Sequence, residues 1–519
     1  MSATAQEYDF VVCGSGSSGS VVARRLAEHP EVKVLLLEAG GTDDIPEVME
    51  PAQWFTNLGS SRDWGFQSQP SPAVNQRSIP LSMGKVLGGG SSINVLGWAR
   101  GHQRDWDFFA SEAGDDAWGY DSVLEIYRRI EDWHGEPDPK YRGSGGPMSI
   151  EPASDPHPIA PALVDAARSV GIPTFSSNNG PMMEHDAGAA MFDLIMRAGL
   201  RHSVYRGYVE PILRQPNLTV LTSAMVSRLV IEGHRVTGVE FRQNGTEYRA
   251  RARAEVVLSL GAINTPKVLM YSGIGDQAQL RSQEIPVMQH LPGVGQNFQD
   301  HPRIDLVWQY PADPDLVNVH NNGGEATFFW KSRADIDTPD VQICLVESLV
   351  CSPENAGRYT LPTAGFTMCM GLVRPHSRGR VTLTGRDPMD PVQIEANMLT
   401  HPDDVKAAVA GVRICREIAD VGPLRPYFTR EVMPGNLSDE DLERFVRDAA
   451  MDYFHQTCTA KMGRDPMSVV DSKLKVYGLE GIRIADGSIM PRVPTGNSMA
   501  SCVVIGERAA DILRSEYAL

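Results

Sequence analysis

Six residues near the start of the chain have the types and spacing needed to bind the phosphates of a dinucleotide. They form the GxGxxG run Gly14-Ser15-Gly16-Ser17-Ser18-Gly19, and an acidic residue follows at Glu38. Gly14 permits a tight turn, Gly16 lets the backbone approach a pyrophosphate, and Gly19 lets a helix pack closely on a strand. The start of that helix offers free N–H groups to negative charge, and Glu38 can accept hydrogen bonds from a ribose. The motif predicts a site for NAD or FAD and does not separate them.

The residues around this motif predict the elements that must position it. Residues 10–13 are a short apolar run, residues 20–27 have apolar residues at helical spacing, and residues 32–37 are a second apolar run that ends at Glu38. A GxGxxG run is informative when strand, turn, helix and strand occur in this order. The alternative interpretation, an ordinary glycine turn, is therefore the less favoured one.

A second glycine-rich stretch covers residues 84–94 and contains Gly88-Gly89-Gly90 followed by two serines. Consecutive glycines are costly in a regular element, but they suit backbone that lies against a ligand. The neighbouring side chains Val86, Leu87 and Ile93 are apolar and would be buried, unlike those of a solvated linker. We therefore expect this stretch to line the same site.

Composition limits the class of protein. A chain of 519 residues, with 42% hydrophobic and 22% charged residues, predicts two or three globular domains. A net charge of −17 argues against nucleic acid or an anionic membrane surface as a partner. The seven scattered cysteines form no CxxC pair, which predicts reduced thiols and no metal site. Without a signal peptide or a run of about eighteen apolar residues, we expect a cytoplasmic protein with no membrane span.

Two groups of elements follow along the chain. Strands at residues 218–221, 226–232, 236–241 and 255–260, a hairpin turn at Asn244-Gly245 and a helix that starts at Thr265 and Pro266 are expected to extend the first sheet. Residues 303–451 contain strands at 303–310, 326–331, 341–350, 365–373 and 380–384 and a helix at 403–419. This second pattern is typical of an antiparallel sheet in an α+β domain. The expected fold class is a Rossmann-like α/β domain joined to an α+β domain.

Four further stretches, residues 261–275, 292–302, 454–463 and 482–498, complete a set of motifs through which the chain resembles the glucose–methanol–choline (GMC) family of flavin-dependent oxidoreductases. The two signatures of that family match residues 84–107 and 261–275, and the resemblance extends over essentially the whole chain. Residues 461–465 and 468–471 make it most similar to bacterial choline-dehydrogenase-like and sorbose-dehydrogenase-like alcohol oxidoreductases.

The resemblance implies the GMC fold and an FAD cofactor. It implies that residues 1–152, 200–302 and 452–519 form the FAD-binding domain, and that residues 153–199 and 303–451 form the substrate-binding domain. Some members of the family attach FAD covalently through a histidine where this chain has Ile93, so non-covalent FAD is expected. The residues that the resemblance assigns to FAD are Gly14, Gly16, Ser17, Ser18, Gly19, Glu38, Ala39, Leu87, Gly88, Gly89, Ser91, Asn94, Val95, Val226, Asp486, Gly487, Asn497 and Ser498.

The resemblance also implies a catalytic pair, His455 and Asn497. In such an enzyme a small-molecule alcohol gives a hydride to flavin N5 while His455 removes the hydroxyl proton, and an aldehyde or ketone forms. A neutral imidazole suits proton removal near neutral pH, and the amide of Asn497 can donate a hydrogen bond to the alcohol oxygen. Oxygen or a quinone-type acceptor would reoxidise the flavin. Tyr453 stands where some oxidases of the family have a small residue, which disfavours easy access of oxygen.

Several alternatives stay open. An FAD-containing hydroxynitrile-lyase-like enzyme and a flavoprotein without turnover would share this fold. His301 is expected to be structural and to make a hydrogen bond within its own turn, and His102, His202, His290, His320 and His376 are expected to be ordinary structural residues. Glu347 could anchor a cationic substrate, but a solvated or paired carboxylate is favoured. The sequence decides neither the alcohol nor the oligomeric state.

Overall fold

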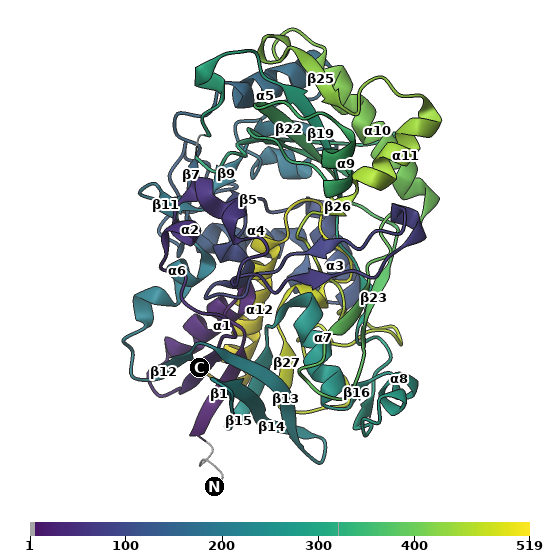
Figure 1. Ribbon diagram of the computed structural model, residues 1–519. Coiled ribbons are helices and arrows are strands. Elements are labelled where there is room, and N and C mark those ends of the chain that lie inside the picture. Colours follow the sequence, from purple (N-terminus) through teal and green to yellow (C-terminus); the bar gives the residue numbers. More distant parts are fainter. Residues whose placement is uncertain (1–5, 320) are drawn as a thin grey trace.

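The computed structural model describes residues 6–319 and 321–519. In it, the GxGxxG run connects the first strand of a seven-stranded sheet to the first helix of the chain (Figure 1). The strands follow the order β12-β2-β1-β15-β14-β13, and β27 also pairs with β15. Pairing is parallel from β12 through β15 and at β27, and antiparallel from β15 through β13. The strand bounds are Gln6–Cys13 (β1), Val34–Leu37 (β2), Leu218–Leu221 (β12), Ala224–Glu232 (β13), Arg235–Gln243 (β14), Thr246–Leu258 (β15) and Ile482–Ile484 (β27).

This sheet confirms the predicted arrangement around the nucleotide motif. Every residue of β2 is buried, as expected of a parallel strand that is covered on both faces. The turn between β14 and β15 is the predicted hairpin, because Asn244 and Gly245 both have positive φ, 49° and 80°. Two such residues form the turn whose twist matches that of the flanking strands.

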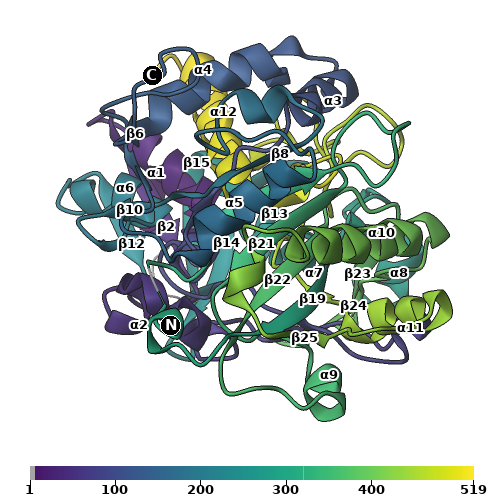
Figure 2. The same ribbon diagram turned by 90° about the horizontal axis from the view of Figure 1, so that it is seen from above.

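The second seven-stranded sheet is antiparallel throughout and has the order β25-β19-β22-β21-β20-β8, with β26 also paired to β19. Helices α5 and α10 lie across one face of this sheet (Figure 2). The predicted α+β arrangement is therefore confirmed. The bounds are Gly188–Met191 (β8), Pro302–Gln309 (β19), Ala326–Trp330 (β20), Val341–Val346 (β21), Gly365–Leu372 (β22), Arg430–Met433 (β25), Met451–Asp452 (β26), Ile159–Ser169 (α5) and Pro402–Ala419 (α10).

Shorter elements surround the two sheets. The predicted strand at residues 380–384 forms, but as β23 in a small sheet with β18 and β24 and not in the second large sheet, because the short connection at residues 384–391 pairs it directly with β24. The small strands are Phe66–Gln67 (β3), Pro80–Leu81 (β4), Gly97–Trp98 (β5), Glu131–Trp133 (β6), Met148–Pro152 (β7), Asp193–Leu194 (β9), Met196–Arg197 (β10), Leu200–Arg201 (β11), Ile274–Gly275 (β16), Gln289–His290 (β17), Gln296–Phe298 (β18), Gly379–Leu383 (β23) and Val392–Glu395 (β24). The remaining helices are Ser17–Ala27 (α1), Pro46–Met49 (α2), Gln103–Ala113 (α3), Tyr120–Ile130 (α4), Val204–Tyr208 (α6), Gly261–Tyr271 (α7), Gln277–Ser282 (α8), Pro353–Arg358 (α9), Asp439–Ala449 (α11) and Met499–Tyr517 (α12).

The predicted start of helix α7 was wrong. The helix begins at Gly261, so Pro266 lies inside it and not in its first turn. Proline has no N–H, and this normally leaves the carbonyl four residues earlier without a partner. Here that carbonyl, of Ala262, accepts a hydrogen bond of 2.6 Å from the hydroxyl of Thr459. A residue distant in sequence therefore satisfies the group that proline leaves unpaired.

The last helix, α12, packs against α1, the helix that follows the GxGxxG run (Figure 1). Gly506 makes this close approach possible, because a Cβ there would lie 2.7 Å from Ser18 O and 2.8 Å from Val21 Cβ. The hydroxyl of Ser18 donates to Cys502 O at 2.6 Å. The end of the chain therefore fixes the position of the first phosphate-binding helix.

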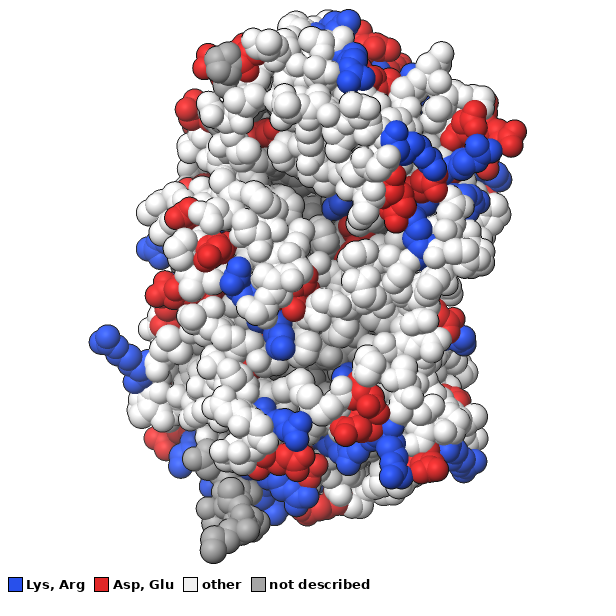
Figure 3. Space-filling model, in the orientation of Figure 1, with Lys and Arg blue, Asp and Glu red and all other residues white. Residues whose placement is uncertain are grey.

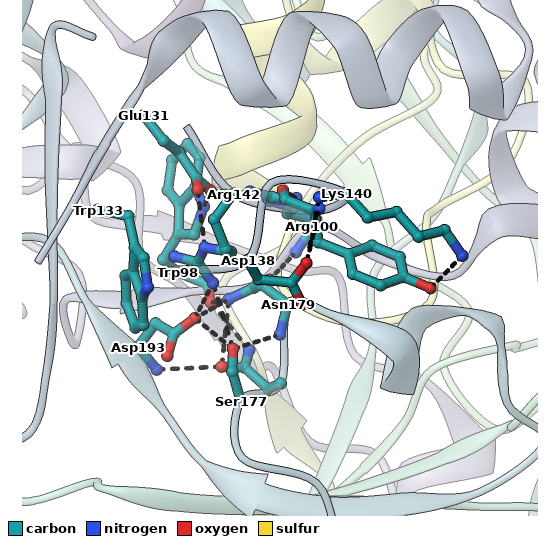
Figure 4. Close-up of polar contacts among 12 residues, drawn as sticks. Trp98, Arg100, Glu131, Trp133, Asp138, Lys140, Arg142, Ser177, Asn179 and Asp193 are labelled. Atoms are coloured by element: carbon teal, nitrogen blue, oxygen red, sulfur yellow. Dashed lines mark hydrogen bonds and ion pairs between the residues drawn. The ribbon is translucent and has the colours of Figure 1, made fainter. Parts of the chain in front are cut away.

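A buried polar cluster, made of Arg100, Glu131, Arg142, Asp193 and Asn179, joins residues near β5 to β6 and β9 (Figure 4). Glu131 forms ion pairs with both arginines, and Arg142 Nη1 lies 2.6 Å from Asp193 Oδ2. The Asn179 amide nitrogen donates to the same Asp193 oxygen at 2.8 Å. Two guanidinium groups and two carboxylates give the cluster no net charge, as buried ions require.

Candidate active site

A cavity extends from the GxGxxG run to His455, between the two large sheets, and the surface is hollowed at this level on the face shown in Figure 3. Most residues that the sequence assigned to the site line this cavity, although they come from distant parts of the chain. The predicted residues in its lining are Gly14, Gly16, Ser17, Ser18, Glu38, Ala39, Gly89, Ser91, Asn94, Val95, Val226, His455, Asp486, Gly487, Asn497 and Ser498.

Three predicted residues are not part of the lining: Gly19, Leu87 and Gly88. They support the loops that line the cavity. A Cβ at Gly19 would collide with the carbonyl oxygen of Gly14, so only glycine permits this contact of helix with turn. The N–H of Gly88 donates to Ser15 O at 3.1 Å, and the carbonyl of Leu87 accepts from the Ser92 hydroxyl at 2.6 Å. The first bond joins the two glycine-rich stretches, and the second stabilises the turn within residues 84–94.

The phosphate end of the cavity has the space and the donors that a pyrophosphate needs. A Cβ at Gly16 would meet no atom within 4 Å. Helix α1 begins directly after Gly16, and no side chain caps its first N–H groups and no acidic residue lies in its first turn. A helix start of this kind favours a bound anion. The residues present therefore fit the phosphates of a dinucleotide cofactor.

Two carboxylates of the lining are held by backbone N–H groups. Glu38 Oε2 accepts from Ser15 N and Oγ at 3.1 and 2.7 Å, and its Oε1 accepts from Gly40 N at 2.8 Å. Asp486 accepts from Gly261 N at 2.9 Å and from Ser488 N at 2.8 Å. Burial raises the pKa of both carboxyls, and these hydrogen bonds oppose that shift. Both carboxylates therefore stabilise the glycine loops as well as lining the site.

A chain of hydrogen bonds passes through His455. Gln342 Nε2 donates to Asn497 Oδ1 at 3.1 Å, and Asn497 Nδ2 lies 3.2 Å from His455 Nε2. On the other side of the ring, His455 Nδ1 lies 2.9 Å from Nδ1 of His301. Because an amide nitrogen can only donate, His455 Nε2 must hold a lone pair and Nδ1 must carry the proton. The nitrogen that faces Asn497 is therefore the one that can act as a base.

The pairing of β26 with β19 positions the two histidines. His301 directly precedes β19, His455 follows β26 by three residues, and Pro302 pairs with Asp452. Asp300 Oδ1 then accepts from the backbone N–H of both histidines, at 2.7 Å for His301 and 3.0 Å for His455. Burial, followed by the neighbouring Asp452 carboxylate, raises the pKa of Asp300 well above its ordinary value. The buried Asp300 carboxyl group therefore holds the backbone of both histidines.

Both imidazoles are neutral in this environment. Burial lowers the pKa of His455 to about 3, and burial together with the neighbouring His455 lowers the pKa of His301 well below its ordinary value. A neutral ring has the lone pair that a general base requires. The lone pair of His455 is therefore not occupied by a proton at neutral pH.

The sequence did not predict the roles of two members of this arrangement. Gln342 was not singled out. The ring of His301 was expected to form a hydrogen bond within its own turn, but it contacts His455, which is 154 residues away in the sequence. No local pattern predicts such a contact. Glu347 was expected to be a solvated or paired carboxylate, and its exposure of 3% excludes the solvated alternative. His102 and His202 have structural partners, as expected, and His320 lies outside the described residues.

The described residues, 6–319 and 321–519, contain neither a membrane-spanning helix nor a group of metal ligands. None of their helices is long and apolar enough to cross a bilayer. They also contain no group of three or more His, Cys, Asp or Glu residues that could hold a metal ion.

Comparison with known proteins identifies relatives of this chain. The N-terminal and C-terminal models of the GMC oxidoreductase family match residues 8–303 and 375–506. The chain is 35% identical to the mitochondrial choline dehydrogenase of Mus musculus, over 99% of this chain and 90% of that protein. It is also 35% identical to an oxygen-dependent choline dehydrogenase of Stenotrophomonas maltophilia, over 99% of this chain and 96% of that protein.

Two solved structures have the same fold. A pyridoxine 4-oxidase from Mesorbium loti has a TM-score of 0.92 at 28% identity, with 99% of each chain covered. A formate oxidase of Aspergillus oryzae has a TM-score of 0.90 at 27% identity, with 100% of each chain covered. These likenesses cover both large sheets and the cavity between them.

Proposed function

Because the chain belongs to the GMC oxidoreductase family and is an FAD-dependent oxidoreductase of CH–OH donors, we propose that it oxidises a small alcohol with His455 as the base. Residues 1–152, 200–302 and 452–519 would form the cofactor domain, and residues 153–199 and 303–451 the substrate domain. The product is an aldehyde or a ketone. We place the enzyme in the cytoplasm.

The lining of the cavity would hold the cofactor. Gly16 and the start of α1 would bind the pyrophosphate, Glu38 the adenosine ribose, and Val226 would lie near the adenine. When bound, FAD supplies the acceptor for the hydride. Ile93 also lines the cavity, and because its hydrocarbon side chain has no atom that could form a bond to the ring, we propose that FAD is non-covalent.

The proton step belongs to His455 and its two partners. Nε2 takes the hydroxyl proton, and Asn497 Nδ2 donates a hydrogen bond to the developing alkoxide. The ring then carries a proton on each nitrogen, and its Nδ1–H remains hydrogen-bonded to His301 Nδ1. Base catalysis of this kind contributes about 10²–10⁴-fold. Both imidazoles are closed off from bulk water, since His301 is 0% and His455 7% exposed.

One observation carries the proposal: Asn497, His455 and His301 form one hydrogen-bonded line, so the lone pair of Nε2 lies beside the Asn497 amide, and both residues line the cavity. A lyase could use the same histidine, and a flavoprotein without turnover could keep the same fold. Mixing the holoenzyme with alcohols in the absence of oxygen tests the choice. Bleaching of the flavin absorbance supports oxidation, whereas unchanged absorbance with a broad panel of alcohols would favour the alternatives.

The electron acceptor is oxygen or a quinone-type compound. Tyr453 packs beside the base, with ring centroids 5.1 Å apart, so a bulky ring lies next to His455 where some oxidases of the family have a small residue nearby. We therefore favour a quinone-type acceptor. The same panel of alcohols, assayed once with oxygen and once with an artificial acceptor, tests this preference.

A further inference from the structure

The lining of the cavity that contains the proposed base also contains an arginine. Arg303, on β19, lines the cavity together with Tyr453, Phe454 and His455. It pairs with Met451 of β26, so it lies beside the segment that carries His455. Its guanidinium carbon lies 5.5 Å from the centre of the Phe454 ring, and the residue is 7% exposed. A positive group is thus built into the same cavity as the proposed base.

One edge of this guanidinium is occupied and another is available. Arg303 Nε lies 2.9 Å from Asp305 Oδ1, and Nη2 donates to Asp305 Oδ2 at 3.2 Å. Asp305 is two residues further along the same strand, so it projects from the same face. No residue of the described chain forms a hydrogen bond with Nη1. Burial alone would lower the pKa of Arg303, but Asp305 raises it, so the group stays charged.

The described lining offers no free carboxylate to a cation. Its acidic residues are Glu38 and Asp486, and both are held by backbone N–H groups of the glycine loops. Asp305, the nearest partner of Arg303, is 0% exposed and does not line the cavity. An ammonium group bound in the cavity would therefore find the Arg303 guanidinium in the lining and no carboxylate of the described lining free to pair with it.

We propose that the substrate is an alcohol that carries a carboxylate, which Nη1 of Arg303 binds, and that quaternary ammonium alcohols are disfavoured. This inference rests on the proposed alcohol oxidation at the same site. A guanidinium donates strong, directional hydrogen bonds to carboxylates, and a like charge in a buried site rejects the wrong ligand. The relatives at 35% identity are named for choline, so the inference separates this chain from them.

Alcohols of similar length and different charge test the inference on the holoenzyme. We would compare 4-hydroxybutanoate, 4-hydroxybutanamide and (3-hydroxypropyl)trimethylammonium, and the para-carboxylate, para-carboxamide and para-trimethylammonium forms of benzyl alcohol. The readout is the second-order rate constant of anaerobic flavin reduction. In the series that the cavity accepts, the rate constant for the carboxylate should exceed that for the amide by about ten- to hundredfold. This is the range expected of a hydrogen bond to a charged group. The ammonium form should be the poorest. An ammonium form that equals or exceeds the carboxylate would overturn the inference.

Variants show whether Arg303 causes the preference. Arg303→Gln should abolish the advantage of the carboxylate over the amide, and Arg303→Lys should keep part of it. Arg380→Gln is the matched control, because Arg380 forms a comparable ion pair with Glu395 at the surface and does not line the cavity. It should leave the preference unchanged. Thermal melting and flavin absorbance establish that each variant is folded and loaded. A carboxylate advantage that survives in Arg303→Gln would refute the assignment.

A binding measurement separates this inference from the proposed function. Butanoate and benzoate cannot be oxidised at a hydroxyl, so their binding is followed by the change in flavin absorbance and by thermal shift. If neutral alcohols reduce the flavin and the carboxylate forms have no advantage, the inference alone fails. If no alcohol reduces the flavin, the proposed function fails, and saturable carboxylate binding that Arg303→Gln abolishes still supports the anion site. If carboxylate binding is absent in the wild type, that site is excluded.

Discussion

Nδ1 of His301 lies 2.9 Å from Nδ1 of His455, and the two rings meet edge to face at 74°. Because Asn497 donates to the other nitrogen of His455, this contact fixes the tautomer of the proposed base. His301 does not line the cavity. We therefore propose that it is a positioning residue that acts through His455.

Replacing His301 should slow the reaction without removing the cofactor. We expect His301→Ala to lower the rate of flavin reduction by about tenfold or more, since the base that it orients contributes about 10²–10⁴-fold. The substrate concentration at half-maximal rate should change little. Glutamine, whose side-chain oxygen can accept from His455 Nδ1, should restore part of the rate. His290→Ala, at an exposed position, is the control. A variant with an unchanged rate and an unchanged pH profile would contradict the positioning role.

Replacing the proposed base itself should lower the rate of flavin reduction far more than replacing His301 does. His455→Ala is expected to retain FAD and to lose about 10²–10⁴-fold in the rate of flavin reduction. Asn497→Ala removes a donor to the developing alkoxide, and a loss of about 10²–10³-fold is expected. Stopped-flow measurements without oxygen report this step directly. Normal kinetics in His455→Ala would exclude it as the base.

The pH profile should show that the base is already deprotonated. Protonation of His455 removes the lone pair, so the rate must fall as the pH falls through its pKa. Burial lowers that pKa from 6.5 to about 3, and we therefore expect a flat rate of flavin reduction between about pH 5 and pH 8. An acidic limb centred near the ordinary histidine value would show that the imidazole is not buried in solution.

The same shift should make the protein less stable in acid. The unfolded chain binds protons on these histidines below pH 6.5 and the folded chain does not, so the free energy of unfolding decreases as the pH falls below that value. Urea titrations at several pH values measure this slope. The slope should become shallower in His301→Asn, which has no group that titrates.

Parts of the fold were predictable because their signals are local. The GxGxxG run, its two strands and its helix lie within one short stretch, and runs rich in apolar residues mark β19, β21 and β22. Strand β8 was missed because the stretch before and within it is rich in Gly and Met, and its register comes from β20. The start of α7 depends on Thr459, and the contact of His301 with His455 depends on the pairing of β26 with β19. Such relationships arise only when distant segments fold together.

Two glycines of the same motif should behave differently when changed to alanine. At Gly16 an added methyl group meets nothing within 4 Å but occupies the space assigned to the pyrophosphate. We expect Gly16→Ala to fold, with a loss of at most about 1 kcal/mol from the poorer helix cap, and to bind much less FAD. Gly41→Ala, where the added group also meets open space outside the lining, is the control. Full FAD content in Gly16→Ala would place the phosphates elsewhere.

At Gly19 the added methyl group would collide with the backbone of Gly14. Gly19→Ala should therefore lower the free energy of unfolding by about 1–3 kcal/mol or more even without cofactor, because helix α1 must move away from the turn. Urea unfolding of the apoprotein measures this change. An apoprotein as stable as the wild type would mean that the close contact of Gly19 with Gly14 is absent in solution.

The buried polar cluster of Figure 4 should be a large source of instability when one charge is removed. Glu131 is 0% exposed, accepts from Trp98 Nε1 at 2.6 Å and pairs with Arg100 and Arg142. Glu131→Gln preserves shape but leaves two guanidinium groups with one carboxylate, so a loss of about 3–5 kcal/mol is expected. Asp511→Asn is the control, because its ion pair with Arg129 is partly exposed and should contribute about 0–1 kcal/mol. Urea unfolding of both variants gives the comparison. Equal losses in the two would show that water reaches the cluster, since only a desolvated guanidinium makes the missing charge costly.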